Sequence, residues 1–235
     1  MPRIARGPTS DVVSHIVSRG NGRATVFGDL DDYAAFVALL GEACEREPMR
    51  VIGCCLMPNH FHLVIWPPKG GDLSRWMQWL MTSQVRRHHR RYGTSGHVWE
   101  GRYKSFPVEP RRVSAEARRR GVVESGDPVL TVLRYVERNP VRAGLAFPAE
   151  AWPWSSAHWW AEPGMAPAFW RREWWSRPED WLDLVNRPQR DAELAALRRS
   201  VQRGRPFGRE AWVTRMAQEW GLGSTLRPRG RPRRK

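Results

Sequence analysis

Long apolar runs are missing from this sequence of 235 residues. A helix that crosses a membrane needs roughly 18 consecutive apolar residues, and no stretch approaches that length. The first ten residues, MPRIARGPTS, also lack the apolar segment of a secretory signal. We therefore expect a cytoplasmic protein. Because 41% of the residues are apolar, we expect it to form a folded body rather than a disordered chain.

Cysteine is scarce, since the chain has only Cys44, Cys54 and Cys55. Three residues at these spacings form neither a zinc-binding pattern nor an even set of disulfide partners. We expect all three thiols to be reduced and to pack as small apolar side chains in the core. We expect no small-molecule cofactor.

Acidic residues are outnumbered by basic residues. The 39 Lys and Arg residues exceed the 24 Asp and Glu residues, which gives a net charge of +15 and a pI of about 11.2. Nearly all of the cations are arginine, whose planar guanidinium suits phosphate groups and base stacking. A charge of this size favours nucleic acid as the partner, because bound cations release counterions from phosphates. It does not favour a membrane surface, because no basic helix has a clean apolar face.

The apolar pattern alternates between strand-like and helix-like segments. Strands are predicted at residues 12–19, 50–57, 60–66 and 104–109. Helices are predicted after Asp29, over residues 73–92 and over residues 129–139, where Pro140 ends the last one. The order βαββαβ predicts a ferredoxin-like sandwich, an α+β fold with an antiparallel sheet covered by helices on one face.

Two histidines stand two residues apart in the third predicted strand. Strand side chains alternate between faces, so His60 and His62 lie on one face and Phe61 lies on the other. Neighbouring imidazoles are natural ligands for a divalent ion. The same pattern also occurs where histidines only pack, so the pair alone leaves both interpretations open.

Tyr135 and Asn139 are four residues apart in the helix predicted at 129–139, so they share one face. A tyrosine oxygen can act as a covalent nucleophile, and an amide oxygen can complete the coordination shell of an ion. The alternative is a half-buried aromatic residue followed by an asparagine at the end of the helix.

Four segments in fixed order resemble the single-tyrosine HUH transposases, and within them the REP-associated tyrosine transposases and their relatives. The resemblance covers roughly residues 10–160. The segments are LMPNHFHLVIW (56–66), GHVWEGRYKSF (96–106), LRYVERNPVRAGL (133–145) and WPWSS (152–156).

The resemblance implies a metal-dependent enzyme that cuts and rejoins single-stranded DNA at hairpin-forming repeats through a 5′-phosphotyrosine intermediate. It implies that His60 and His62 bind Mg²⁺ or Mn²⁺, that Tyr135 is the nucleophile and that Asn139 is a third ligand. Some relatives have a second tyrosine near the position of Val129, and this chain has none there.

The resemblance also divides the chain. We expect a transposase-like catalytic domain at 1–160, a Trp-rich and helical extension at 161–225 and a disordered basic tail at 226–235. Residues 148–181 are rich in Trp and Pro and predict an irregular wrap over the body, whereas 191–202 and 209–220 predict short helices. Residues 111–126 predict a basic loop or a poorly anchored helix.

Arginines in two places are candidate DNA contacts. Those in the second half of the helix at 73–92 would bind phosphates, although a solvated basic face is the alternative. Those in the tail stand in an RGRP sequence that resembles an AT-hook, which binds a narrow minor groove. The candidates are Arg86, Arg87, Arg90, Arg91, Arg229 and Arg231.

Two other functions are compatible with the sequence. A domesticated DNA-binding protein would keep the fold without turnover, but pure binding would not need the histidines, Tyr135 and Asn139 together. A basic RNA-binding module is less favoured, because no strand carries the aromatic signature of such modules. For the transposase-like enzyme we expect a monomer rather than a homodimer, associated with the bacterial nucleoid.

Overall fold

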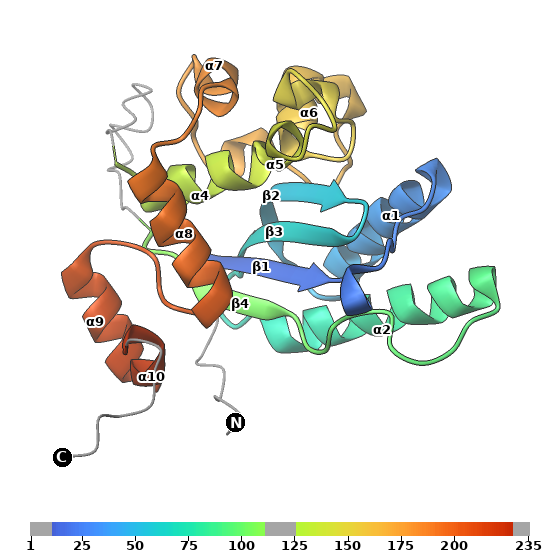
Figure 1. Cartoon of the computed structure of the whole chain (residues 1–235), viewed down its shortest axis with the longest axis horizontal. Helices are drawn as coiled ribbons and strands as arrows, with labels where there is room; N and C mark the ends of the chain where they lie inside the picture. Colours follow the sequence, from blue (N-terminus) through green and yellow to red (C-terminus); the bar gives the residue numbers. More distant parts are fainter. Residues whose placement is uncertain (1–10, 111–125, 228–235) are drawn as a thin grey trace.

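The centre of the protein is a four-stranded antiparallel sheet with the strand order β2-β3-β1-β4 (Figure 1). The computed structural model describes residues 11–110 and 126–227. The strands are β1 (Ser14–Arg19), β2 (Arg50–Met57), β3 (His60–Trp66) and β4 (Lys104–Pro107). The hairpin predicted from β2 and β3 is confirmed residue for residue, whereas β1 begins later and β4 ends earlier than predicted.

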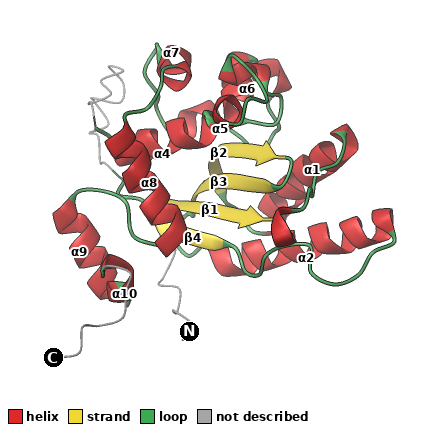
Figure 2. Ribbon diagram, viewed as in Figure 1, coloured by secondary structure: helices red, strands yellow, loops and turns green. Residues whose placement is uncertain are grey.

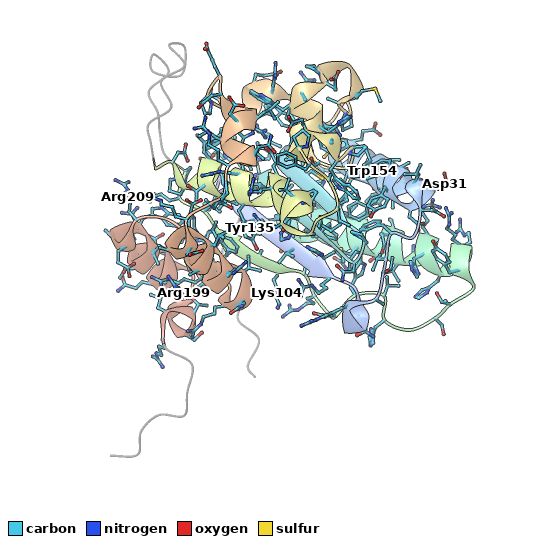
Figure 3. All side chains as sticks on the ribbon, turned by 45° about the horizontal axis from the view of Figure 1, so that its top comes forward. Asp31, Lys104, Tyr135, Trp154, Arg199 and Arg209 are labelled. Atoms are coloured by element: carbon cyan, nitrogen blue, oxygen red, sulfur yellow. The ribbon has the colours of Figure 1, made fainter. Side chains whose placement is uncertain are left out.

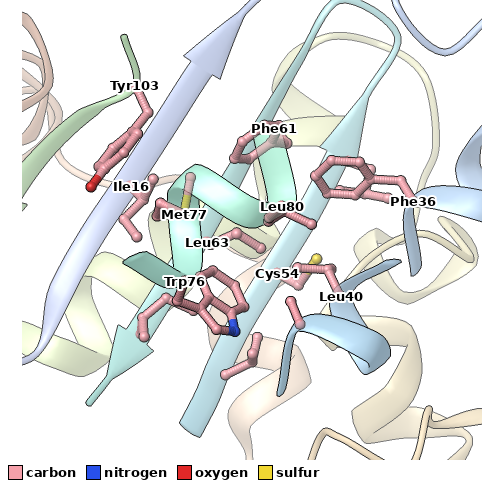
Figure 4. Close-up of a cluster of buried hydrophobic side chains, with 14 of the residues drawn as sticks. Ile16, Phe36, Leu40, Cys54, Phe61, Leu63, Trp76, Met77, Leu80 and Tyr103 are labelled. Atoms are coloured by element: carbon pink, nitrogen blue, oxygen red, sulfur yellow. The ribbon is translucent and has the colours of Figure 1, made fainter. Parts of the chain in front are cut away.

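Two long helices, α1 (Leu30–Arg46) and α2 (Leu73–Tyr92), cover one face of the sheet (Figure 2). Asp29 and Asp72 cap them by accepting hydrogen bonds from backbone N–H groups of the first turn. Their apolar stripes meet the inward side chains of the sheet in a core that includes Phe36, Phe61 and Trp76 (Figure 4). The predicted ferredoxin-like βαββαβ order is therefore confirmed.

A third helix, α4 (Pro128–Glu137), packs on the opposite face of the sheet. Asp127 caps it, and Pro128 stands in the first turn, where a missing N–H costs nothing. Gly53 of β2 allows α4 to come close, because a Cβ at this position would stand 2.4 Å from Leu133 Cδ2. The faces of the sheet thus have separate cores, and His60 and His62 belong to the face under α4.

The helix predicted at 129–139 ends earlier than expected. α4 stops at Glu137, and a short helix, α5 (Asn139–Arg142), begins immediately after Arg138. The prediction that Pro140 ends the helix was wrong, because Pro140 lies in the first turn of α5, where proline is tolerated.

The Trp-rich stretch wraps over the body, as predicted, and packs into the cores on both faces of the sheet, but it contains more regular structure than its composition indicated. Trp154 O accepts a hydrogen bond from Leu56 N at 2.9 Å, so the stretch extends the free edge of β2. Trp159, Trp170 and Trp181 are buried and anchor this segment to the core. Its short helices are η2 (Ala149–Ala151), α6 (Ser156–Ala161), η3 (Pro163–Met165), η4 (Arg172–Trp174) and α7 (Trp181–Asn186).

The C-terminal region is helical, as predicted, with α8 (Asp191–Arg203), α9 (Glu210–Glu219) and α10 (Gly223–Leu226). The turn between α8 and α9 packs on the end of β4, where Phe207 bridges Val108 and Arg209 pairs with Glu109 at 2.5 Å. Leu197 of α8 lies in the same core as α4, so the extension is continuous with the body. The boundaries at 160 and 225 stay a prediction.

Three further predictions have separate outcomes. Cys54 and Cys55 are buried free thiols, as expected, whereas Cys44 is only partly buried. No helix in the described ranges is long and apolar enough to cross a membrane. The basic stretch predicted at 111–126 lies outside the described residues except for its last residue. The tail arginines Arg229 and Arg231 also lie outside the described residues.

Candidate active site

Three imidazoles lie together on the sheet face under α4. His60 and His62 project from β3 with ring centroids 5.1 Å apart, which confirms that they share a face. His15 projects from β1 and stacks on His62, with centroids 5.0 Å apart and an interplanar angle of 5°. Its Nε2 lies 2.9 Å from His62 Nδ1, at hydrogen-bonding distance.

His15 was not among the predicted site residues. A single histidine in a β-branched strand is typical of simple packing, and only the pairing of β1 with β3 brings it beside His62. The alternation of side chains along β1 could have indicated its position, because it places His15 and Val17 on the same face. Val17 lies opposite His62 in the sheet.

Burial keeps these imidazoles neutral. It lowers the pKa of His15 to about 3, and the pKa of His62 well below its ordinary value. Burial also lowers the pKa of His60 to about 4, and the nearby positive charges of Arg19 and Arg142 lower it further. A neutral imidazole has the free lone pair that metal binding requires.

Hydrogen bonds at the Nδ1 atoms leave the Nε2 atoms of the histidine pair for other ligands. His60 Nδ1 lies 2.7 Å from Asn59 Oδ1, and because an amide oxygen only accepts, the imidazole donates. If His62 Nδ1 likewise donates to His15, both Nε2 atoms keep their lone pairs. The two imidazoles therefore fit a divalent ion. Among residues 11–110 and 126–227, no group of three His, Cys, Asp or Glu side chains is placed to hold a metal ion.

Tyr135, labelled in Figure 3, belongs to α4, which covers the face of the sheet that carries the imidazoles. Its ring lies edge-on to His62 and His15, with centroid distances of 5.9 and 6.3 Å. The other three tyrosines lie elsewhere: Tyr33 stacks on Phe27 and Trp154, Tyr92 donates a hydrogen bond to Asp32, and Tyr103 belongs to the core under α1 and α2. Tyr135 is thus the tyrosine that the fold places beside the histidines.

Arg142 and Asn139, which follow Tyr135 in the chain, both contact it. The Arg142 guanidinium carbon is 4.2 Å from the centroid of the Tyr135 ring, and Arg142 also donates to Tyr135 O and Asn139 Oδ1. The amide nitrogen of Asn139 donates to the carbonyl oxygens of Tyr135 and Val136. Asn139 Oδ1 therefore accepts one bond already, and its second lone pair is left for a further partner.

A cleft of about 460 Å³ opens beside Tyr135. Its lining includes four exposed cations from three parts of the chain: Arg19 of β1, Arg102 and Lys104 at the start of β4, and Arg198 of α8. Glu100 is the single carboxylate among the lining residues. A positive cleft with a tyrosine at its wall is suited to a phosphodiester strand.

The four arginines of α2 that are predicted to contact DNA divide into two pairs by their partners within the protein. Arg91 forms an ion pair with Asp29 at 2.5 Å and lies close to two more carboxylates, while Arg87 donates to the backbone oxygen of Asp31. Arg86 and Arg90 make no ion pair within the described residues. Their role as DNA contacts stays a prediction.

A buried charge network holds α4 in place. Glu137, in the last turn of α4, pairs with Arg177 at 2.8 Å and accepts hydrogen bonds from Ser156 and Trp181. Ser156 also accepts a hydrogen bond from Cys54 N of β2. The network therefore links α4, the sheet and the Trp-rich wrap, which explains the serine of the WPWSS segment.

Comparison with known proteins finds a family that resembles the part of the chain that carries the histidines. Residues 9–118 match the family model described as "Transposase IS200 like". These residues are therefore similar to the IS200-like transposases. The matched residues include the sheet, α1, α2 and the three histidines of the site, and they end before Tyr135.

Two transposases are similar over more of the chain. A Haemophilus influenzae protein named "Putative REP-associated tyrosine transposase" is 23% identical over 134 residues, which are 55% of this chain and 71% of that protein. The solved structure of a REP-associated tyrosine transposase bound to a REP hairpin aligns with a TM-score of 0.51 at 18% identity, over 73% of this chain and 92% of that one. The structural likeness confirms the fold.

Proposed function

We propose that this protein is a metal-dependent endonuclease and strand transferase that acts on single-stranded DNA at hairpin-forming repeats. The observation that carries the proposal is the position of Tyr135, which lies edge-on to two neutral imidazoles and forms part of the wall of a positive cleft. The domesticated DNA-binding protein is the second candidate, and the same cleft would serve it.

In the proposed reaction, Tyr135 attacks a phosphorus atom of the bound strand. A bond forms between the tyrosine oxygen and phosphorus while the bond from phosphorus to the 3′ oxygen breaks, so the 5′ phosphate stays on the protein. The phenol loses its proton, and the departing 3′ oxygen gains one. A second 3′-hydroxyl reverses these steps and rejoins the strand. The positive charge of Arg142 above the tyrosine ring would stabilise a developing phenolate.

His60, His62 and Asn139 would hold the divalent ion, Mg²⁺ or Mn²⁺. Two imidazole nitrogens and one amide oxygen supply three ligands, and the phosphate or water would supply the others. When bound, such an ion withdraws charge from a non-bridging phosphate oxygen. Arg142 would orient the Asn139 amide by its hydrogen bond to Oδ1.

We propose hairpin DNA as the substrate because a solved relative is bound to a REP hairpin. In this chain, the cleft cations Arg19, Lys104 and Arg198 would bind the phosphates on either side of the cleavage point. We expect the protein to act as a monomer, with Tyr135 working beside the histidines of its own chain.

The test of the reaction is a covalent adduct. Labelled single-stranded hairpins are incubated with Mn²⁺ or Mg²⁺ and separated on a denaturing gel. We expect a metal-dependent protein–DNA band with the native protein and no band with Tyr135→Phe. Tyr92→Phe is the matched control, because it removes an exposed tyrosine hydroxyl away from the histidines, and it should keep the band.

The ligand assignment has its own measurement. We expect Asn139→Ala to raise the Mn²⁺ concentration at half-maximal adduct by about tenfold or more, while Asn139→Asp, which keeps an oxygen beside Arg142, retains tighter binding. Tight hairpin binding with no adduct in any metal would instead support the domesticated binding protein.

A further inference from the structure

His15 places an imidazole in an apolar part of the core. Val13, two residues before it in the chain, and Val64, opposite it in β3, are both fully buried in the core under α4. His15 is itself fully buried, and its Nδ1 has no hydrogen-bond partner among the described residues. An aliphatic side chain would fill this place without burying a polar atom, so packing alone does not explain the histidine.

The other ring nitrogen of His15 has a partner. Its Nε2 lies 2.9 Å from Nδ1 of His62, a residue 47 positions away in the chain. The two rings stack with an interplanar angle of 5°, and both are buried. Stacking and hydrogen bonding together hold the His62 ring in one orientation.

The hydrogen bond of His62 differs in kind from that of His60. A histidine that binds a metal ion through one ring nitrogen usually donates the hydrogen of its other nitrogen to an oxygen. His60 has such an oxygen, because its Nδ1 lies 2.7 Å from Asn59 Oδ1. His62 has the Nε2 atom of His15 in the same role. An imidazole nitrogen can either donate or accept, so this bond has two possible directions.

We propose that His15 is a positioning residue for the divalent ion, because its Nε2 accepts the hydrogen of His62 Nδ1 and so leaves the Nε2 lone pair of His62 free. The inference rests on the metal site proposed above. In the reverse direction, His15 would donate, His62 would have its hydrogen on Nε2, and the ion could not bind there. Because His15 is fully buried, it acts through His62 and not on the DNA.

Binding of Mn²⁺ alone, without DNA, measures this role apart from the reaction. Electron paramagnetic resonance of the free ion gives the dissociation constant. His15→Leu removes the acceptor and keeps an apolar side chain in the core, so we expect the dissociation constant to rise by about tenfold or more. His15→Gln can accept the same hydrogen bond through its amide oxygen, so it should retain most of the native affinity.

Val64→Ala is the control for lost packing. It removes methyl groups from the buried position opposite His15 and leaves the hydrogen bond in place. We expect this variant to be less stable than the native protein but to bind Mn²⁺ with native affinity. Circular dichroism checks that every variant folds.

A second measurement uses the native protein and reads the direction of the hydrogen bond. Nitrogen-15 spectra of protein with labelled histidines distinguish ring nitrogens that carry a hydrogen from those that do not. With saturating Mg²⁺, we expect His15 to carry its hydrogen on Nδ1 and to have none on Nε2. The signals of His15 are identified by their absence from His15→Gln.

Three results would overturn the role of His15 while the native protein still binds Mn²⁺. They are a hydrogen on His15 Nε2 in the Mg²⁺-loaded protein, native affinity in His15→Leu, and equal losses of affinity in His15→Leu and His15→Gln. A native protein that binds no Mn²⁺ would overturn the proposed metal site and this role with it. The adduct assay with Tyr135→Phe tests the nucleophile separately.

Discussion

At the scale of single residues, the unexpected feature is a third histidine beneath the predicted pair. His15 is fully buried, its Nε2 bonds with His62, and its Nδ1 has no hydrogen-bond partner within the described residues. A buried polar atom without a partner costs free energy, so packing alone does not account for an imidazole here. Its position suggests that it orients the His62 ring.

His15 should make the stability of the metal-free protein depend on pH. Its pKa is about 3 in the folded state against 6.5 when exposed, so only the unfolded state gains its proton as the pH falls below 6.5. The stability that comes with a neutral His15 is therefore complete above pH 6.5 and declines toward pH 3. The expected loss from this residue is about 2 kcal/mol between pH 6.5 and about pH 5.

Urea unfolding at a series of pH values in the presence of a chelator measures this effect. His15→Gln should flatten the pH dependence by that amount, whereas His97→Gln, at an exposed histidine, should leave it unchanged. An unaltered slope in His15→Gln would show that His15 is not the group that titrates.

At the scale of elements, the helix that carries Tyr135 is placed by contacts far along the sequence. Glu137 at its end is held by Arg177, Ser156 and Trp181, all from the Trp-rich wrap and α7. Arg177 also donates to Ile52 O of β2 and is surrounded by tryptophan rings. The wrap therefore fixes the angle at which α4 crosses the sheet.

Arg177→Met should strongly destabilise the protein, because it leaves the Glu137 carboxylate buried without a counter-charge. Breaking a buried pair from one side costs about 3–5 kcal/mol. The measurement is the free energy of unfolding in urea. Adding Glu137→Gln should recover part of the loss, since the uncompensated charge is then gone.

Arg171→Met is the control for this network, because Arg171 and Glu173 form an exposed pair at 3.9 Å that should contribute almost nothing. Equal losses in Arg171→Met and Arg177→Met would contradict the role assigned to the buried pair.

At the scale of the whole molecule, we expect the distribution of charge to matter more for DNA binding than the total charge. The chain has a net charge of +15, yet Arg91 is already neutralised by carboxylates of and beside α1. The cations of the Tyr135 cleft, in contrast, are gathered from β1, the start of β4 and α8, with one carboxylate among them. The fold thus concentrates positive charge at the proposed reaction site.

DNA binding should weaken steeply with salt, and the cleft should account for much of the slope. Each of Arg19→Ala, Lys104→Ala and Arg198→Ala should reduce the slope of log K against log salt by about 0.7, because one fewer counterion is released. Arg91→Ala should change the slope much less. Fluorescence anisotropy with a single-stranded oligonucleotide across a salt series measures these slopes. A larger change in slope for Arg91→Ala than for the cleft variants would show that the DNA binds along α2 instead.

Much of the fold could be predicted because its core elements are strongly periodic. The bounds of β2, β3 and α2 agree with the pattern of apolar residues, and alternation within β3 placed His60 and His62 on one face. The short helices α6 and α7 were missed, because six residues rich in tryptophan are too few to show a helical period. The end of α4 was misjudged because proline breaks a helix interior but is accepted in a first turn.

The sequence by itself determined the βαββαβ order, the shared face of His60 and His62 and the excess of positive charge, since each depends on composition or on neighbours along the chain. Only the tertiary structure decided that α4 covers the histidine face, that His15 bonds with His62 and that Arg142 lies over Tyr135. Those contacts join segments tens of residues apart or depend on where a helix ends. The packing of the whole chain sets such contacts, and no local period encodes them.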